Sequence, residues 1–281
     1  MSQADYSALD RPEILSFVFY PRRDFTKAPP SASDHFIPVD KDVSISCRFY
    51  THSQSSPSII YFHGNGEVVS DYDYIAPMYN QLGVNLFVAD YRGYGASQGD
   101  PTFSNMISDA PIIFKTFTDI LHQGHYSSDI FVMGRSLGSV SAIEAAYRYQ
   151  EQMQGVIIES GFASVIRFLS HLGFPAGLLG IEDVDFPNLA KIRSITIPTL
   201  IIHGEYDSLI LPTEGEALFQ NSAAENKHLV IISRANHNDI MVIGKERYLE
   251  AIKEFVFAWY LPHCSLFHLW LSSLGLHSDV P

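Results

Sequence analysis

The chain has few cysteines, few basic residues and no leader-like beginning. Its two cysteines, Cys47 and Cys264, are too few for a disulfide framework and do not have metal-ligand spacing. Lys and Arg number 18 against 31 Asp and Glu, and the resulting net charge of −13 repels nucleic-acid phosphates and anionic lipid surfaces. Residues 1–17 carry several acids and no long apolar run, unlike a secretory signal. We therefore expect a cytoplasmic protein, in a reducing compartment, that binds no nucleic acid.

Nucleotide-binding loops and common metal motifs are also absent. The sequence has no GxxxxGK[ST] phosphate loop and no GxGxxG followed by an acid about twenty residues later. The run RGYGASQG from Arg92 follows a predicted strand but leads to Pro101 rather than to a helix, so we interpret it as a turn. None of the 12 histidines forms an HExxH or HxH motif. We expect neither a cofactor nor a metal.

The remaining composition is that of a folded domain, with 46% hydrophobic and 17% charged residues. Short apolar, β-branched runs recur, each followed by a segment of helical length, which predicts an α/β fold with a mostly parallel central sheet. Because these runs hardly alternate, helices should cover both faces of the sheet. We expect one domain over residues 1–281. The predicted strands are Ser58 to Phe62, Asn85 to Asp90, Ile130 to Gly134, Gly155 to Glu159, Thr199 to His203 and Leu229 to Ser233.

Two upstream segments, Ile14 to Phe19 and Val43 to Tyr50, alternate with period two and predict an antiparallel edge. Between the strands GVIIES and TLIIHG lie about forty residues, rich in apolar side chains, Gly and Pro, without helical periodicity. We interpret about 162–190 as a lid-like insertion, with a plain surface connection as the alternative. The predicted helices are Val68 to Leu82, Asn105 to His122, Leu137 to Glu151, Pro212 to Asn221 and Lys245 to Tyr260.

The pentapeptide Gly134-Arg135-Ser136-Leu137-Gly138 fits the pattern GxSxG and lies between a predicted strand and a predicted helix. That context is typical of a nucleophile elbow, a sharp turn that presents a serine hydroxyl above the carboxyl edge of the sheet. Small residues on either side of the turn let strand and helix approach each other. The pentapeptide alone is a weak signal, because Gly-rich turns before helices are common.

An acid and a histidine follow in the order that a serine nucleophile requires. Its hydroxyl needs a base, and the base needs a carboxylate to orient it. Asp207 follows the strand TLIIHG, and His237 follows the strand LVIIS, so both belong at strand carboxyl ends near Ser136. We prefer Asp207 as the acid and expect Glu159 to cap a helix or anchor the lid. The rival acids are Glu159, Glu205 and Asp239.

The run His63-Gly64-Asn65-Gly66 follows another predicted strand. Its glycines would let backbone approach a substrate, and a tetrahedral intermediate needs two fixed N–H donors. We predict that the backbone amides of Asn65 and Leu137 form the oxyanion hole. For His63 we expect a packing role with hydrogen bonds to loop backbone.

These motifs resemble those of the α/β-hydrolase superfamily, in the branch with HGNGE, DYRGYG and GRSLG, which includes depalmitoylase-like α/β-hydrolase-domain proteins and bacterial esterases. The resemblance implies an α/β-hydrolase fold with Ser136 as nucleophile, Asp207 as acid and His237 as base. The depalmitoylases carry an N-terminal cysteine cluster, whereas residues 1–30 here hold no cysteine, so we expect a different substrate. The matching segments are Tyr61 to Glu67, Asp90 to Gly99, Gly134 to Ser139, Ile197 to Asp207 and Asn236 to Ile240.

The expected function is a serine esterase that cleaves carboxylic esters of short to medium acyl chains through an acyl-enzyme. The same residues could instead act on thioesters or amides, and a non-catalytic binding protein of the same fold is a third hypothesis. Apolar residues of the lid-like insertion would line the acyl site and accept chains up to about C8. These residues are Phe168, Leu169, Leu172, Phe174, Leu178, Leu179 and Ile181.

The C-terminal stretch between Glu254 and Asp279 has no charged side chain and is long enough to span a membrane. We expect no span, because Pro262 interrupts any single helix there. Within the apolar tail, 262–281, four residues share one helical stripe. Packing on the enzyme itself, a homodimer contact and peripheral membrane attachment all remain open. The stripe is Phe267, Trp270, Leu271 and Leu274.

Overall fold

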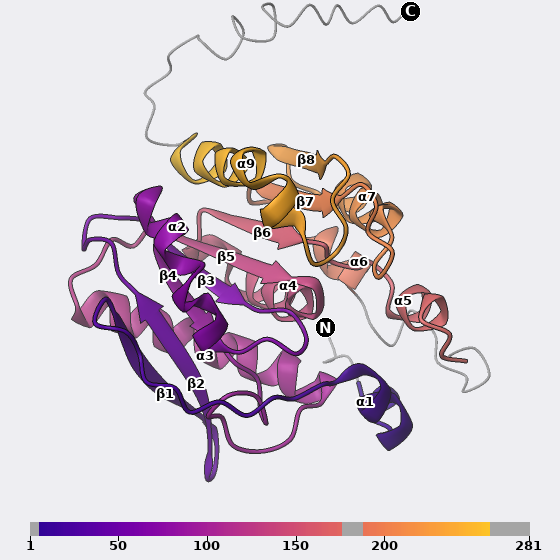
Figure 1. Cartoon of the computed structure of the whole chain (residues 1–281), viewed down its shortest axis with the longest axis horizontal. Coiled ribbons are helices and arrows are strands. Elements are labelled where there is room, and N and C mark those ends of the chain that lie inside the picture. The colour runs from indigo at the N-terminus through magenta and orange to yellow at the C-terminus, as the bar shows by residue number, and fades with distance from the viewer. Residues whose placement is uncertain (1–5, 176–187, 259–281) are drawn as a thin grey trace, which may run out of the picture.

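Eight strands form one sheet across the residues that the computed structural model describes, 6–175 and 188–258 (Figure 1). Their order across the sheet is β1-β2-β4-β3-β5-β6-β7-β8. Strand β2 pairs antiparallel with β1 and β4, and all neighbours from β4 to β8 are parallel, which confirms the predicted mostly parallel sheet. The strands are β1 (Ala32–Asp40), β2 (Val43–Tyr50), β3 (Ser58–Phe62), β4 (Asn85–Ala89), β5 (Ile130–Arg135), β6 (Gly155–Glu159), β7 (Thr199–Gly204) and β8 (Lys227–Ile232).

Helices cover both faces of this sheet (Figure 1). Ile60 and Phe62 of β3 pack into a core built with α3 and α4. Ile59 and Tyr61, which alternate with them, pack into a second core built with α2 and α9. Central strands are apolar on both sides for this reason. The helices on the sheet faces are α2 (Ala76–Gln81), α3 (Phe103–Gln123), α4 (Ser139–Tyr149), α7 (Pro212–Asn221), α8 (Ile240–Ile243) and α9 (Lys245–Phe257).

Near the N-terminus, helix α1 (Pro12–Val18) takes the place of the edge strand predicted from Ile14 to Phe19, so that prediction is wrong. Pro12 lies in the first turn, where its fixed φ and missing amide favour a helix start. Ile14 and Val18 are both buried. A spacing of four residues suits one face of a helix as well as one face of a strand, and the sequence pattern could not separate the two.

The helix predicted from Val68 to Leu82 is also wrong as a single element. It consists of a 3₁₀ turn, η1 (Val69–Asp73), and the separate helix α2. Pro77 lies in the first turn of α2 and has no amide to continue an earlier helix. Strand β1 was not predicted, because Ile37 is its one buried residue and half of its other positions carry polar side chains.

The lid-like insertion predicted at about 162–190 is described in part. Helices α5 (Val165–His171) and α6 (Asn188–Ile192) belong to it, and residues 176–187 lie outside the described residues. The C-terminal tail, 262–281, also lies outside them. Within residues 6–175 and 188–258, none of the helices combines the length and apolar character that crossing a membrane requires.

The segment that follows α1 is fastened to the loop after β3 through the side chain of Asn65. This amide group donates a hydrogen bond to the carbonyl of Val18. Its oxygen accepts hydrogen bonds from the backbone N–H of Tyr20, at 3.0 Å, and from the Tyr94 hydroxyl, at 2.6 Å. The N-terminal segment therefore lies against the loop that carries the HGNGE motif.

Tyr6 fastens the same segment at a second place. Its hydroxyl accepts a hydrogen bond from the Lys191 ammonium of α6 at 2.7 Å, and the ammonium lies 5.2 Å from the centre of the Tyr6 ring. Lys191 is itself buried and paired with Glu144 of α4. Residues 6–20 are thus anchored both to α6 and to the loop after β3.

Replacing Asn65 with alanine should loosen this attachment. We predict that Asn65→Ala lowers the free energy of unfolding by about 2 kcal/mol, because three hydrogen bonds to partly buried groups are lost. Amide hydrogen exchange should accelerate in residues 17–22. Urea unfolding and exchange mass spectrometry measure the two effects.

The matched control is Tyr94→Phe, which removes one hydroxyl and leaves the Asn65 side chain in place. It should accelerate exchange in residues 17–22 less than Asn65→Ala does. Exchange in this segment that is unchanged by Asn65→Ala would mean that packing alone holds it.

Candidate active site

Ser136 lies on a tight turn between β5 and α4. Its φ is +53°, a left-handed value that costs a residue with a side chain about 1–3 kcal/mol. Close packing enforces this turn: a Cβ added at Gly134 would lie 2.6 Å from the carbonyl carbon of Gly138. A Cβ added at Gly138 would lie 2.6 Å from the carbonyl carbon of Phe62. The turn has the strained geometry of the elbow predicted from the pentapeptide.

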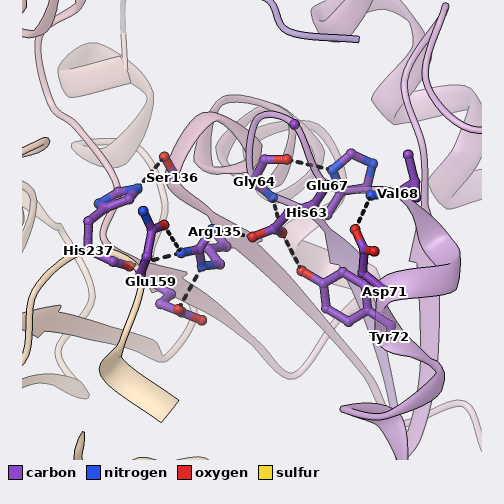
Figure 2. Close-up of polar contacts among 12 residues, drawn as sticks. His63, Gly64, Glu67, Val68, Asp71, Tyr72, Arg135, Ser136, Glu159 and His237 are labelled. Atoms are coloured by element: carbon purple, nitrogen blue, oxygen red, sulfur yellow. Dashed lines mark hydrogen bonds and ion pairs between the residues drawn. The ribbon is translucent and has the colours of Figure 1, made fainter. Parts of the chain in front are cut away.

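The side chains of Ser136, His237 and Asp207 form one hydrogen-bonded chain. Ser136 Oγ lies 2.9 Å from His237 Nε2, and His237 Nδ1 lies 2.7 Å from Asp207 Oδ2. Figure 2 shows the His237 ring beside Ser136. All three residues are at most 6% exposed. The structure thus brings together three residues from the ends of three different strands.

Asp207 is held so that its charge faces His237. Its other oxygen, Oδ1, accepts the backbone N–H groups of Leu209, at 3.0 Å, and Ile210, at 2.8 Å. Burial alone would raise the pKa of Asp207, but hydrogen bonds from His203 and His237 outweigh it and hold that pKa well below its usual value. An ionised carboxylate can only accept hydrogen bonds, so His237 carries its proton on Nδ1 and turns the lone pair of Nε2 toward the serine hydroxyl.

The three rival acids lie elsewhere. Glu205 accepts hydrogen bonds from the Ser233 hydroxyl, at 2.8 Å, and the Arg234 amide, at 2.7 Å. Asp239 accepts the amide of Asn236 at 2.6 Å. Among the described residues, Glu159 does not cap a helix or contact the lid-like insertion, contrary to expectation. Its carboxylate binds Arg135 and two tyrosine hydroxyls.

The two predicted oxyanion donors lie on neighbouring loops. Strands β3 and β5 pair in parallel with Phe62 opposite Gly134, so the loops that carry Asn65 and Leu137 leave the sheet side by side. Leu137 directly follows Ser136 at the start of a 3₁₀ turn, η2 (Ser136–Gly138). The backbone N–H of Asn65 donates to no group in the described parts of the chain.

His63 supports this loop from within, as expected. One nitrogen of its buried ring lies 2.7 Å from the carbonyl oxygen of Gly64, and the other lies 3.1 Å from Asp90. The run RGYGASQG is a turn, as predicted, and the neighbouring Tyr91 hydroxyl donates to the carbonyl of His63 at 2.5 Å. The DYRGYG motif therefore stabilises the loop that carries the HGNGE motif.

The predicted substrate residues are described in part. Phe168 is half-buried and stacks on Phe162 with 4.8 Å between ring centres. Phe174 contacts Phe17 of α1, with 5.0 Å between ring centres, and Leu172 is half-buried at the end of α5. Leu169 is fully buried in the hydrophobic core. Leu178, Leu179 and Ile181 lie outside the described residues.

Three residues beside the site were not singled out in the sequence: His203, Glu67 and Arg135. His203 is buried, and its Nε2 lies 3.3 Å from Asp207. Arg135 pairs with Glu67 and Glu159. One signal could have found this pairing, since a cation that ends a buried strand needs acids at the ends of the neighbouring strands. Among residues 6–175 and 188–258, no three His, Cys, Asp or Glu side chains converge to hold a metal ion.

Comparisons with known proteins agree with this geometry. The family Hydrolase_4, described as serine aminopeptidase, S33, matches residues 53–173. Human alpha/beta hydrolase domain-containing protein 17B is 32% identical over 223 residues, which are 78% of this chain and 73% of the human protein. Mouse alpha/beta hydrolase domain-containing protein 17C is 29% identical over 77% of this chain and 65% of its own length.

Solved structures show the same fold. The esterase Pf2001 of Pyrococcus furiosus superposes with a TM-score of 0.70 at 20% identity, over 85% of this chain and 98% of its own. Est1E of Butyrivibrio proteoclasticus with bound ferulic acid gives 0.68 at 20% identity, over 80% and 99%. With its mostly parallel sheet, its strained serine turn and these relatives, the chain belongs to the α/β-hydrolase superfamily of serine hydrolases.

Proposed function

We propose that the protein hydrolyses carboxylic esters through a covalent acyl-enzyme, without a cofactor. The observation that carries the proposal is the continuous hydrogen-bonded chain from Ser136 Oγ through His237 to Asp207. A serine hydroxyl becomes a competent nucleophile when a neutral imidazole can take its proton, and an ionised carboxylate keeps that imidazole in the correct tautomer. Each of these requirements has a residue at hydrogen-bond distance.

In the first half-reaction, His237 Nε2 accepts the hydroxyl proton as Ser136 Oγ attacks the ester carbonyl carbon. The carbonyl oxygen becomes an oxyanion, which the backbone N–H groups of Asn65 and Leu137 stabilise. His237 then gives its proton to the departing alcohol, and the acyl group stays on Ser136. In the second half, water loses a proton to His237, attacks the acyl carbon and releases the carboxylic acid.

The same residues could serve thioesters or amides, and the family matched at residues 53–173 is described as a serine aminopeptidase. We favour esters over peptides, because among the described residues of the site there is no unpaired carboxylate beside Ser136 to bind the free amino terminus of a peptide. Glu67, Glu159 and Asp207 are all engaged by protein groups. A panel of a p-nitrophenyl ester, an acyl-CoA and an acyl amide, run side by side, compares the three classes.

Loss of the serine hydroxyl should abolish turnover. We predict that Ser136→Ala lowers kcat for a p-nitrophenyl ester by about 10⁴ to 10⁶, because members of a triad act as a unit. A fluorophosphonate probe should label the wild-type protein at Ser136, and peptide mass spectrometry locates the label. Ser139→Ala, three residues along the chain, is the matched control and should keep both activity and labelling.

Two results would contradict the proposal. Activity of Ser136→Ala close to that of the wild type would remove Ser136 as nucleophile. Absence of probe labelling in a folded wild-type protein, together with no turnover of any substrate in the panel, would support a non-catalytic binding protein of the same fold.

For the acyl chain we propose a groove beside the acid loop. It has a volume of about 300 Å³ and lies between α5, α7 and the residues that follow Asp207. Its apolar lining comes from Phe168, Leu209, Ile210, Leu211 and Ala217. Glu214 of α7 holds the start of α5, because its carboxylate accepts the amides of Ala163, at 2.9 Å, and Ser164, at 3.0 Å. These hydrogen bonds therefore hold α5 in place as one wall of the groove.

Chain-length preference tests this groove. Each bound methylene contributes about 0.8 kcal/mol at most, so kcat/KM should rise from C2 esters up to about C8 and then level. We predict that Phe168→Ala flattens this rise, whereas Ile112→Ala, at an exposed position of α3, leaves it unchanged. Steady-state kinetics over an ester series measures the slope. A wild-type profile that is flat or falls with length would exclude the groove as the acyl site.

A further inference from the structure

The side chain of Arg135 is 12% exposed and lies at the centre of a polar network beneath the serine turn (Figure 2). Its Nε donates to Glu159 at 3.1 Å, and its Nη1 donates to Glu67. Its Nη2 donates to the backbone carbonyl of His237, at 2.9 Å, and to the side-chain oxygen of Asn238, at 3.0 Å. Four protein acceptors therefore surround one guanidinium group.

The two acids approach from either side of β5: Glu159 ends β6, and Glu67 lies in the loop that follows β3. In the sheet order, β5 lies between β3 and β6, and Arg135 is directly opposite Glu159 in the register. The second oxygen of Glu159 accepts the hydroxyls of Tyr248, at 2.7 Å, and Tyr61, at 3.3 Å. Burial alone would lower the pKa of Arg135, but the two carboxylates together have the larger, opposite effect. The pKa is therefore raised above its usual value, and the guanidinium stays charged. The ion pair between Arg135 and Glu159 thus joins two neighbouring strands of the sheet.

Glu67 extends the network to the loop of the oxyanion donors. Its second oxygen accepts the backbone N–H of Gly64 at 2.8 Å and the Tyr72 hydroxyl at 2.7 Å. Gly64 is next to Asn65, whose amide is a proposed oxyanion donor. A Cβ at Gly64 would overlap the Arg135 guanidinium, so this loop and the arginine are in direct contact.

The contact with His237 is the third connection. Elsewhere, the loop that carries His237 is joined to the loop that carries Asp207. There the Ala235 carbonyl accepts a hydrogen bond from the backbone N–H of Tyr206 at 2.8 Å. Arg135 instead joins the backbone of His237 to the end of β5, directly before Ser136. The base and the nucleophile are therefore linked twice, once through their own hydrogen bond and once through the arginine that precedes the serine.

We propose that Arg135 is a positioning residue, which sets the placement of the His237 base and of the oxyanion loop relative to Ser136. The proposal rests on the proposed function. Because its donors are directed at protein acceptors, Arg135 acts on the reaction through these loops rather than by contact with substrate. Its loss should therefore reduce kcat and leave KM nearly unchanged, since misplacement of about 1 Å costs about 100-fold.

The experiment compares Arg135→Ala, Arg135→Lys and Arg247→Ala by steady-state kinetics. Arg247 is a half-exposed arginine of α9 that also pairs with a glutamate, so it controls for loss of an ion pair. We expect Arg135→Ala to lose about 100-fold in kcat with KM within about threefold of the wild type. Arg135→Lys keeps the charge but not the planar fork, so it should lose about tenfold in kcat. Arg247→Ala should behave as the wild type.

Chemical rescue separates positioning from general stability. Low millimolar guanidinium chloride, far below denaturing concentrations, should restore part of the kcat of Arg135→Ala, because the free cation fits the space left between the two glutamates. It should not raise the kcat of Arg135→Lys, whose side chain fills that space. Thermal unfolding measured in parallel reports on the fold, and if Arg135→Ala does not fold, the kcat and KM of Arg135→Lys decide.

Unchanged kcat in Arg135→Lys and Arg135→Ala would overturn the proposal, and so would a rise in KM without a fall in kcat. These outcomes differ from failure of the proposed function. If that function is wrong, the fluorophosphonate probe fails to label Ser136 in the wild type. If only the role of Arg135 is wrong, the probe labels the wild type and Arg135→Ala at equal rates.

Discussion

The sharp turn at Ser136 is the constraint on which the site depends. A left-handed φ at a residue with a side chain is unfavourable by itself, and it persists because the ends of β5, β3 and α4 press together around it. The parallel sheet then places the other groups at the same edge, since the loops that follow its parallel strands all leave at the carboxyl edge where this turn lies. Asp207 and His237 meet Ser136 although the base lies 101 positions farther along the chain.

Much of this arrangement could be predicted from the sequence. Five of the parallel strands, β3 to β7, are nearly continuous apolar runs, because both of their faces are buried. Elements near the edges were less predictable. The spacing of the buried residues Ile14 and Val18 in α1 would suit a strand equally well. Strand β1 buries Ile37 alone. Local patterns are ambiguous where an element buries only one or two side chains.

For the network around Arg135, the sequence indicates that a cation at the end of a buried strand needs acids nearby, but not which acids these are. Arg135 and Glu67 are 68 positions apart, and they meet because β3 and β5 are neighbours in the sheet. A sequence gives each strand but not the order in which strands pair, and a buried ion pair depends on that order. Such a pair is costly to break, since removal of one partner leaves a charge without compensation in a poorly solvated place.

The attachment of the N-terminal segment has a consequence for synthesis on the ribosome. Tyr6 is made well before its partner Lys191, which follows 185 positions later, and the base at His237 comes later still. Contacts this distant in sequence form slowly, because a long loop must close before they stabilise anything. A nascent chain that stops short of β8 carries Ser136 without its base. The activated nucleophile therefore arises only when nearly the whole domain has emerged.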